Sequence, residues 1–182
     1  MKPRIILSAR KFKLTLDRLC YQLLENHRDF ADTILVGIQP RGIRLAEKIH
    51  RQLVQSSGQD IESGIIDPTF YRDDYRSGDK QLTPTTMAMP VSLEGKRVVL
   101  IDDVLFSGRT VRAAMDALLD FGRPSKVELL VLIDRRFSRD LPIQADYVGK
   151  TIDSLTSEKV KVEWGKTEDE DCIWILPKHA EV

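Results

Sequence analysis

Cysteine is scarce in this chain of 182 residues: only Cys20 and Cys172 occur, without a second cysteine or a histidine cluster nearby. A disulfide framework and a zinc site are therefore not expected, and both thiols should be small, buried or half-buried side chains in a reducing compartment. His27, His50 and His179 lie apart, without metal-ligand spacing, and are expected on the surface.

Long apolar runs and an excess of one charge are also missing. No stretch is long enough to cross a bilayer, and MKPRIILSARK at the start is too weakly apolar for a signal peptide. The 28 basic and 28 acidic side chains balance, which argues against binding of nucleic acid by the whole surface. We expect a soluble, cytoplasmic protein with no membrane partner.

Internal repeats and low-complexity linkers are absent too, so residues 1–182 are expected to form a single domain. The acidic run 168–171 is continuous and does not match a calcium loop, which favours a solvated turn.

Apolar periodicity predicts alternating helices and strands. The expected helices cover about 9–28 (inward Phe12, Leu16, Leu19, Leu23), the segment GIRLAEKIHRQLVQ after Arg41 (inward Ile43, Ala46, Ile49, Leu53) and about 110–121 (inward Val111, Ala114, Met115, Leu118). The expected buried strands are 33–38, 61–67, 97–102 and 127–134, followed by short strands in ADYVGKTI, EKVKVEW and CIWIL with Trp164 and Trp174 packed on them. This alternation predicts the α/β class, with a mostly parallel sheet flanked by helices.

Residues 68–96 form a long polar segment that carries Pro68, Pro84 and Pro90. A loop of this length inside a compact domain is usually functional, often a lid over a site. We expect a flexible active-site loop at about 69–89.

Three of the predicted strands end in polar residues. Parallel strands place their carboxyl ends at one edge of the sheet, where ligands bind. The three endings are Gln39-Pro40-Arg41-Gly42, Asp102-Asp103 and Asp134-Arg135-Arg136. Their convergence predicts a site at this edge.

The segment after the two aspartates can hold an anion. Ser107, Gly108, Arg109 and Thr110 lie at the start of the third helix, where free backbone N–H groups and the helix dipole favour phosphate. The same residues also fit a simple helix start, with Thr110 as the cap and Gly108 in the turn. These four residues alone leave both interpretations open.

The adjacent Asp102 and Asp103 restrict the choice of ligand. Two carboxylates would repel a phosphate, but they suit hydroxyl groups or a bridging cation. A ligand with a 5′-phosphate, a ribose diol and a leaving pyrophosphate carried by Mg²⁺ would satisfy both halves of the segment.

VVLIDDVLFSGRT (98–110) resembles the phosphoribosyl pyrophosphate (PRPP) signature of type I phosphoribosyltransferases. Four further segments resemble the PyrR family, pyrimidine-operon attenuators with uracil phosphoribosyltransferase activity. They are ILVGIQPRGIRLA, DPTFYRDDYR, VRAAMDALLDFGRP and LPIQADYVGK. The resemblance covers nearly the whole chain. It implies the type I fold, the substrates PRPP and uracil, the products UMP and pyrophosphate, and a requirement for Mg²⁺.

The resemblance also implies roles for residues. Asp102 and Asp103 would bind the ribose hydroxyls near the reacting carbon, with either one able to contact Mg²⁺, and Arg72 would act from the closing loop. The implied PRPP loop is Val104, Leu105, Phe106, Ser107, Gly108, Arg109 and Thr110, and the implied pyrophosphate loop is Gln39, Pro40, Arg41 and Gly42. The family's pyrophosphate loop commonly holds a cis peptide, and proline lowers its cost, so Gln39–Pro40 is expected to be cis at least when ligand is bound.

A hood built from the N-terminal segment and parts of about 134–182 is implied to hold the base, through Asp134, Arg135, Tyr147 and Val148. The PRPP signature does not touch the base, so a purine phosphoribosyltransferase remains the alternative enzyme. The resemblance also implies a homodimer or a larger homo-oligomer.

The third possibility is an RNA-binding regulator with vestigial catalysis. The resemblance implies a basic surface that binds the pyr mRNA leader in a UMP-dependent way. Its candidate residues are Lys11, Lys13, Arg18, Arg44, Lys48 and Arg51. Asp17 lies on the same helix as the first three and would oppose phosphate binding.

Overall fold

The computed structural model describes residues 3–73, 89–154, 157–165, 167 and 170–177. Its strands are β1 (Arg4–Leu7), β2 (Thr33–Ile38), β3 (Glu62–Ile66), β4 (Arg97–Leu105), β5 (Lys126–Arg135), β6 (Tyr147–Ile152), β7 (Glu158–Glu163) and β8 (Cys172–Pro177). Its α-helices are α1 (Ala9–His27), α2 (Gly42–Ser57) and α3 (Arg109–Leu118), and short 3₁₀ turns cover Thr69–Tyr71 and Leu119–Phe121.

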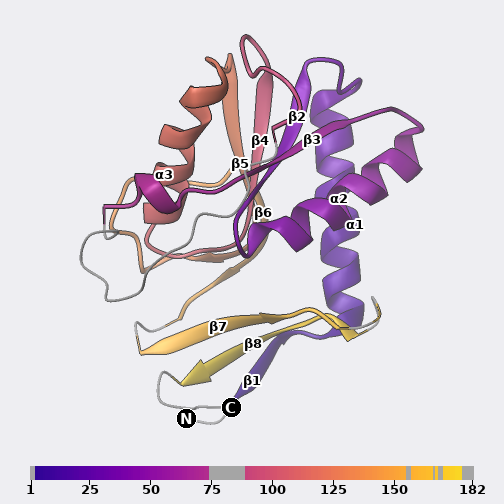
Figure 1. The fold of residues 1–182 in the computed structure, drawn as a ribbon. Coiled ribbons are helices and arrows are strands. Elements are labelled where there is room, and N and C mark those ends of the chain that lie inside the picture. Colours follow the sequence, from indigo (N-terminus) through magenta and orange to yellow (C-terminus); the bar gives the residue numbers. More distant parts are fainter. Residues whose placement is uncertain (1–2, 74–88, 155–156, 166, 168–169, 178–182) are drawn as a thin grey trace.

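The larger sheet has five parallel strands in the order β3-β2-β4-β5-β6. Helices α1 and α2 cover one face and α3 covers the other (Figure 1). The expected α/β class and mostly parallel sheet are therefore confirmed, and this is the architecture of the type I phosphoribosyltransferase fold.

The strands of this sheet read as continuous apolar runs because both of their faces are covered. In β4, Val99 and Ile101 belong to the core beneath α1 and α2, whereas Val98 and Leu100 belong to the core beneath α3. All four side chains are fully buried, so β4 is the central support of the molecule.

A second, smaller sheet is antiparallel, with the order β1-β8-β7. It joins the N-terminal segment to the C-terminal segment and lies beyond one end of the parallel sheet (Figure 1). Leu7 and Ile173 from this sheet are buried in the core that α1 also shares, so the two sheets pack as one body.

Several expected details are wrong. Met115 is exposed, because α3 turns Ala113 and Ala117 toward the sheet instead. In α2, Ile49 and Leu53 are fully buried as expected, but Leu45 is buried as well, while Ile43 and Ala46 are only half-buried.

The histidines and the acidic run also differ from expectation. His27 is buried rather than exposed: its Nε2 lies 3.0 Å from Glu128 Oε2 and its Nδ1 lies 3.1 Å from Thr33 Oγ1. His50 is half-buried, and His179 lies outside the described residues. Within the acidic run, Asp171 is almost fully buried, so this end of the run is not a solvated turn.

Both thiols fit the expectation, since Cys20 is buried and Cys172 is half-buried. Most of the expected loop at about 69–89 lies outside the described residues, which include only 69–73 and 89 of it. Among the helices that the structure describes, none combines the length and apolar character needed to span a bilayer.

Candidate active site

A cavity of about 740 Å³ lies where the carboxyl ends of the parallel strands meet the small sheet. Its walls come from three strand ends of the larger sheet, from the start of α3 and from β7. The lining residues are Gln39, Pro40, Arg41, Arg72, Asp102 to Val111, Arg135, Asp140 and Glu158 to Val160. The predicted convergence of polar strand ends is therefore present in the folded chain.

Asp102 and Asp103 both line this cavity, although adjacent residues in a strand point to opposite faces. Both carboxyls are buried, and burial together with the neighbouring Asp103 raises the pKa of Asp102 to about 8. Burial also raises the pKa of Asp103, against the influence of Arg41, which lowers it. β4 continues to Leu105, so the two aspartates lie inside the strand rather than after it. Because both carboxyls are buried, their ionised forms need a cation or a hydrogen-bond donor in the cavity.

The turn between β4 and α3 forms one wall of the cavity. Gly108 is the N-cap of α3 and has φ of 90°, a backbone conformation that favours glycine. Since glycine has no side chain to cap the helix, the first N–H groups of α3 depend on other acceptors. Ser107 Oγ accepts only a long hydrogen bond of 3.4 Å from the N–H of Arg109. The position suits an anion.

Basic side chains stand around this turn. Arg72 donates to Thr110 Oγ1 at 3.4 Å, which brings the closing-loop residue to the start of α3. The Arg109 guanidinium pairs with Asp73 Oδ2 at 2.6 Å and Asp140 Oδ2 at 3.1 Å. Arg109 is thus held on the rim by two carboxylates.

The segment 39–42 lies beside the two aspartates, because β2 pairs with β4. The Gln39–Pro40 peptide bond is cis, as expected from the sequence. Gly42, the first residue of α2, packs so closely on β4 that a Cβ atom there would overlap the carbonyl oxygen of Ile101. Gln39, Pro40 and Arg41 line the cavity, whereas Gly42 supports it from behind.

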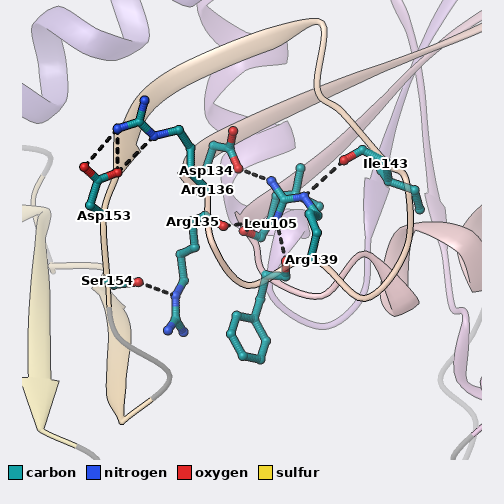
Figure 2. Close-up of polar contacts among 9 residues, drawn as sticks. Leu105, Asp134, Arg135, Arg136, Arg139, Ile143, Asp153 and Ser154 are labelled. Atoms are coloured by element: carbon teal, nitrogen blue, oxygen red, sulfur yellow. Dashed lines mark hydrogen bonds and ion pairs between the residues drawn. The ribbon is translucent and has the colours of Figure 1, made fainter.

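Of the four residues predicted to hold the base, Arg135 lines the cavity, whereas Asp134, Tyr147 and Val148 do not. Arg135 lines the cavity, where its guanidinium lies 4.2 Å from the Phe106 ring and donates to Ser154 Oγ at 2.7 Å (Figure 2). Asp134 instead pairs with Arg139. Tyr147 lies at the start of β6, away from the cavity, with its hydroxyl bonded to Asn26.

The residues predicted to bind RNA are also divided. Lys11 and Lys13 are exposed on α1, and Arg44 is exposed beside a smaller cavity of about 350 Å³ that adjoins the main one. The Arg18 guanidinium donates to the carbonyl oxygens of Val148 and Gly149, which ties α1 to β6. Another basic residue of α2, Lys48, forms a 2.8 Å ion pair with buried Asp171.

Sequence reasoning missed several contributors. Asp140 comes from the segment after β5, and Glu158, Lys159 and Val160 come from the small sheet. No motif marks them, because the cavity gathers them from segments that only the tertiary fold brings close. Arg139 was missed for the same reason, although its guanidinium binds carbonyl groups of the turn that follows β4.

The donor set fits a magnesium ion that arrives with its substrate. Carboxylate oxygens are the ligands that Mg²⁺ prefers, and Asp102 and Asp103 supply them inside the cavity. Among the residues that the structure describes, no group of three or more acids, histidines or cysteines could hold a metal ion. A magnesium ion here would therefore take most of its ligands from the substrate and water.

Fold and site define a class of protein. A family model for the phosphoribosyl transferase domain matches residues 4–167. The fold is similar to a hypoxanthine phosphoribosyltransferase from Staphylococcus aureus, with a TM-score of 0.63 and 23% identity over 84% of this chain and 80% of that one. It is also similar to a hypoxanthine phosphoribosyl transferase from Trypanosoma cruzi, with a TM-score of 0.68 and 16% identity over 93% and 89% of the two chains.

The particular family follows from the sequence relatives. The chain is 41% identical to the bifunctional protein PyrR of Bacillus cereus (strain AH820), over 96% of this chain and 97% of the relative. It is 40% identical, with the same coverage, to the bifunctional protein PyrR of Bacillus mycoides. The chain belongs to the PyrR family of phosphoribosyltransferases.

Proposed function

We propose that this protein transfers the phosphoribosyl group of PRPP to uracil, giving UMP and pyrophosphate. The observation that carries the proposal is the pair of buried carboxyls, Asp102 and Asp103, in one cavity with the turn that opens α3. Family membership supports the class of reaction, and full-length similarity to PyrR proteins supports a pyrimidine.

The chain's own groups have separate tasks. The amides of the turn and the hydroxyls of Ser107 and Thr110 hold the 5′-phosphate. Asp102 and Asp103 accept hydrogen bonds from the ribose hydroxyls and stabilise positive charge that develops at C1′ of the sugar. Positioning of this kind contributes up to about 7–11 kcal/mol to lowering the barrier, and fixed electrostatics contribute a further few kcal/mol.

Departure of pyrophosphate needs positive charge and exclusion of water. Arg41 lines the cavity close enough to the aspartates to lower their pKa, and Arg72 lines it beside Thr110 at the start of α3. When bound, Mg²⁺ neutralises charge on the leaving pyrophosphate, and Asp102 or Asp103 would contact it. Arg72 also lies near the start of the segment of about 69–89 that is expected to close over the substrate, which would keep water from hydrolysing the activated sugar.

The test is a comparison of bases with PRPP and Mg²⁺. Formation of UMP from labelled uracil should exceed formation of nucleotide from hypoxanthine or guanine at equal concentration. Asp103→Asn should lower the rate of UMP formation, whereas Asp153→Asn, in an exposed ion pair with Arg136, should leave it unchanged. Faster turnover of a purine would assign the chain to the alternative enzyme class.

A second function, regulation through RNA, is favoured by the description of the relatives as bifunctional and by the exposed Lys11 and Lys13 on α1. The expected result is that UMP increases the affinity of the protein for a pyrimidine-operon leader RNA in a filter-binding titration. If the protein does not bind this RNA, or binds it equally well without UMP, the regulatory function is wrong and only the enzymatic function remains. Such a protein would act in the cytoplasm. We expect it to form a homodimer or a larger assembly, and light scattering would measure the mass of that assembly.

A further inference from the structure

Arg139 lies beside the phosphate-binding turn but does not line the cavity. It follows β5 in the segment that returns toward β6, and its side chain is largely buried, at 19% exposure. Figure 2 shows its guanidinium among the carbonyl groups of several segments.

The guanidinium makes an unusually complete set of hydrogen bonds. Its Nε donates to the carbonyl oxygen of Ile143 at 3.1 Å, and one Nη donates to that of Leu105 at 3.1 Å. The same Nη also donates to the carbonyl oxygens of Phe106 and Arg135, and the other Nη pairs with Asp134. Only a planar group with five fixed donors can serve acceptors in so many directions.

The neighbouring backbone continues this pattern. The N–H groups of Asp140 and Leu141 both donate to the carbonyl oxygen of Ser107, at 3.0 and 3.2 Å. Three consecutive carbonyl groups, those of Leu105, Phe106 and Ser107, are therefore all held by the segment 139–141.

This arrangement fixes the opposite side of the turn as well. In a trans peptide the C=O and N–H point in opposite directions. When the carbonyl groups of Leu105, Phe106 and Ser107 point toward the segment 139–141, the N–H groups of the next residues point away from it. Those next residues are Phe106, Ser107 and Gly108, and all three line the cavity.

We propose that Arg139 is a positioning residue, which holds the turn after β4 with its N–H groups presented to the 5′-phosphate of the substrate. This inference rests on the proposed function for the identity of the ligand. Asp134 orients Arg139 in turn, and the positive charge of Arg139 is balanced by Asp134 rather than by the ligand.

The chain offers a matched control. Arg136 lies three residues away and also pairs with a carboxylate, through two nitrogens, but its partner is exposed Asp153 and its hydrogen bonds do not reach the turn (Figure 2). Arg136→Lys and Arg139→Lys therefore make the same chemical change in the same segment. Both variants keep the positive charge and remove the planar guanidinium. Any difference from the wild type therefore reflects the lost hydrogen-bonding geometry and not a lost charge.

The first measurement is the affinity for ribose 5-phosphate by calorimetry, together with the KM values for PRPP and uracil. Arg139→Lys should weaken ribose 5-phosphate binding and raise KM for PRPP by about tenfold or more, since it removes several hydrogen bonds that shape an anion site. KM for uracil should change less than about twofold. Arg136→Lys should match the wild type in all three values, and equal effects of the two variants would overturn the proposal.

The second measurement needs no ligand. The N–H groups of Asp140 and Leu141, which donate to the carbonyl oxygen of Ser107, report how firmly the turn is held. Amide hydrogen exchange at these two residues should be faster by about tenfold in Arg139→Lys than in Arg136→Lys, while exchange within β4 stays unchanged. Unchanged exchange at Asp140 and Leu141 would contradict the positioning role. If Arg139→Lys does not fold, Asp134→Asn keeps the guanidinium and loosens only its anchor, and should show the same changes to a smaller degree.

The two proposals fail in different ways. If the wild-type protein binds ribose 5-phosphate but makes no UMP, the proposed function is wrong. The hydrogen-exchange and affinity measurements would still test the positioning role of Arg139. A wild-type protein that makes UMP, with the two lysine variants indistinguishable, would end the role of Arg139 alone.

Discussion

Asp102 combines burial with a position inside the cavity, and this combination has a consequence for catalysis. Its pKa is raised to about 8 by burial and by Asp103, so near neutral pH the side chain largely keeps its proton. A protonated carboxyl is a poorer partner for Mg²⁺ and for ribose hydroxyls. We therefore expect kcat/KM for PRPP to rise with pH and level off above about 8.

The measurement is a pH profile of UMP formation in wild type and Asp102→Asn. Asp102→Asn should form UMP more slowly, and its kcat/KM should no longer rise with pH as the wild-type value does. Asp153→Asn, at an exposed residue that does not line the cavity, should keep the wild-type profile. A wild-type profile that is flat across this range would contradict the raised pKa.

The same carboxyl affects stability with a defined sign. Since the folded-state pKa of Asp102 lies above the ordinary value of 3.8, the folded protein holds a proton that the unfolded chain has lost between these two values. The free energy of unfolding of the unliganded protein should therefore fall as pH rises toward about 8. His27 contributes little between about pH 7 and 8, because burial lowers its pKa below the ordinary 6.5.

Urea titrations at several values between about pH 7 and 8 measure this free energy of unfolding. Asp102→Asn cannot gain the charge, so its free energy of unfolding should change less with pH than that of the wild type. An equal slope in both proteins would assign the pH dependence to other groups.

Gly42 shows how close contacts support the site from behind. A Cβ atom at this position would overlap the carbonyl oxygen of Ile101 and lie 3.1 Å from Cα of Asp102. Gly42→Ala should therefore destabilise the protein by about 1–3 kcal/mol and also lower kcat, because the backbone that carries the carboxyl must move. Gly58→Ala is the control: its φ of 68° costs about 1 kcal/mol, but the added Cβ has no atom within 4 Å and activity should persist.

At the scale of elements, the sequence predicted the parallel sheet because both faces of its strands are apolar, a pattern that β2, β4 and β5 share. It also predicted which strand ends meet. It did not predict Met115 on the outside of α3 or Leu45 on the inside of α2, since a helix with apolar residues on a wide arc can rotate without breaking its periodicity. Which residues complete the cavity from β7 depends on the packing of two sheets, for which no local pattern exists.

Lys48 illustrates how an element-level contact changes the interpretation of a surface residue. It was a candidate RNA contact, but its Nζ joins α2 to Asp171 at the start of β8, and that carboxylate is almost fully buried. Lys48→Met should destabilise the protein by roughly 1–3 kcal/mol, because the carboxylate loses its cation while remaining buried. Lys11→Met on exposed α1 should change stability by less than about 0.5 kcal/mol.

Chemical denaturation measures both variants. The double change Lys48→Met with Asp171→Asn should recover part of the stability, since the unpaired charge is then gone. A Lys48 variant as stable as the wild type would return this residue to the set of candidate RNA-binding residues.

At the scale of the whole molecule, 28 basic and 28 acidic side chains cancel, so affinity for RNA can come only from a local surface. Helix α1 carries exposed Lys11 and Lys13 on one side of the larger sheet, and α3 covers the other side (Figure 1). The double variant Lys11→Gln with Lys13→Gln should weaken binding of leader RNA and reduce the slope of log affinity against log salt by about 0.7 for each phosphate that the protein no longer neutralises. UMP formation should not change, because neither lysine lines the cavity.

The control is Arg123→Gln. Arg123 is exposed just after the α3 segment, so this change removes one positive charge from another part of the surface and should leave the slope unaltered. Equal slopes in all three proteins would place the RNA surface away from α1.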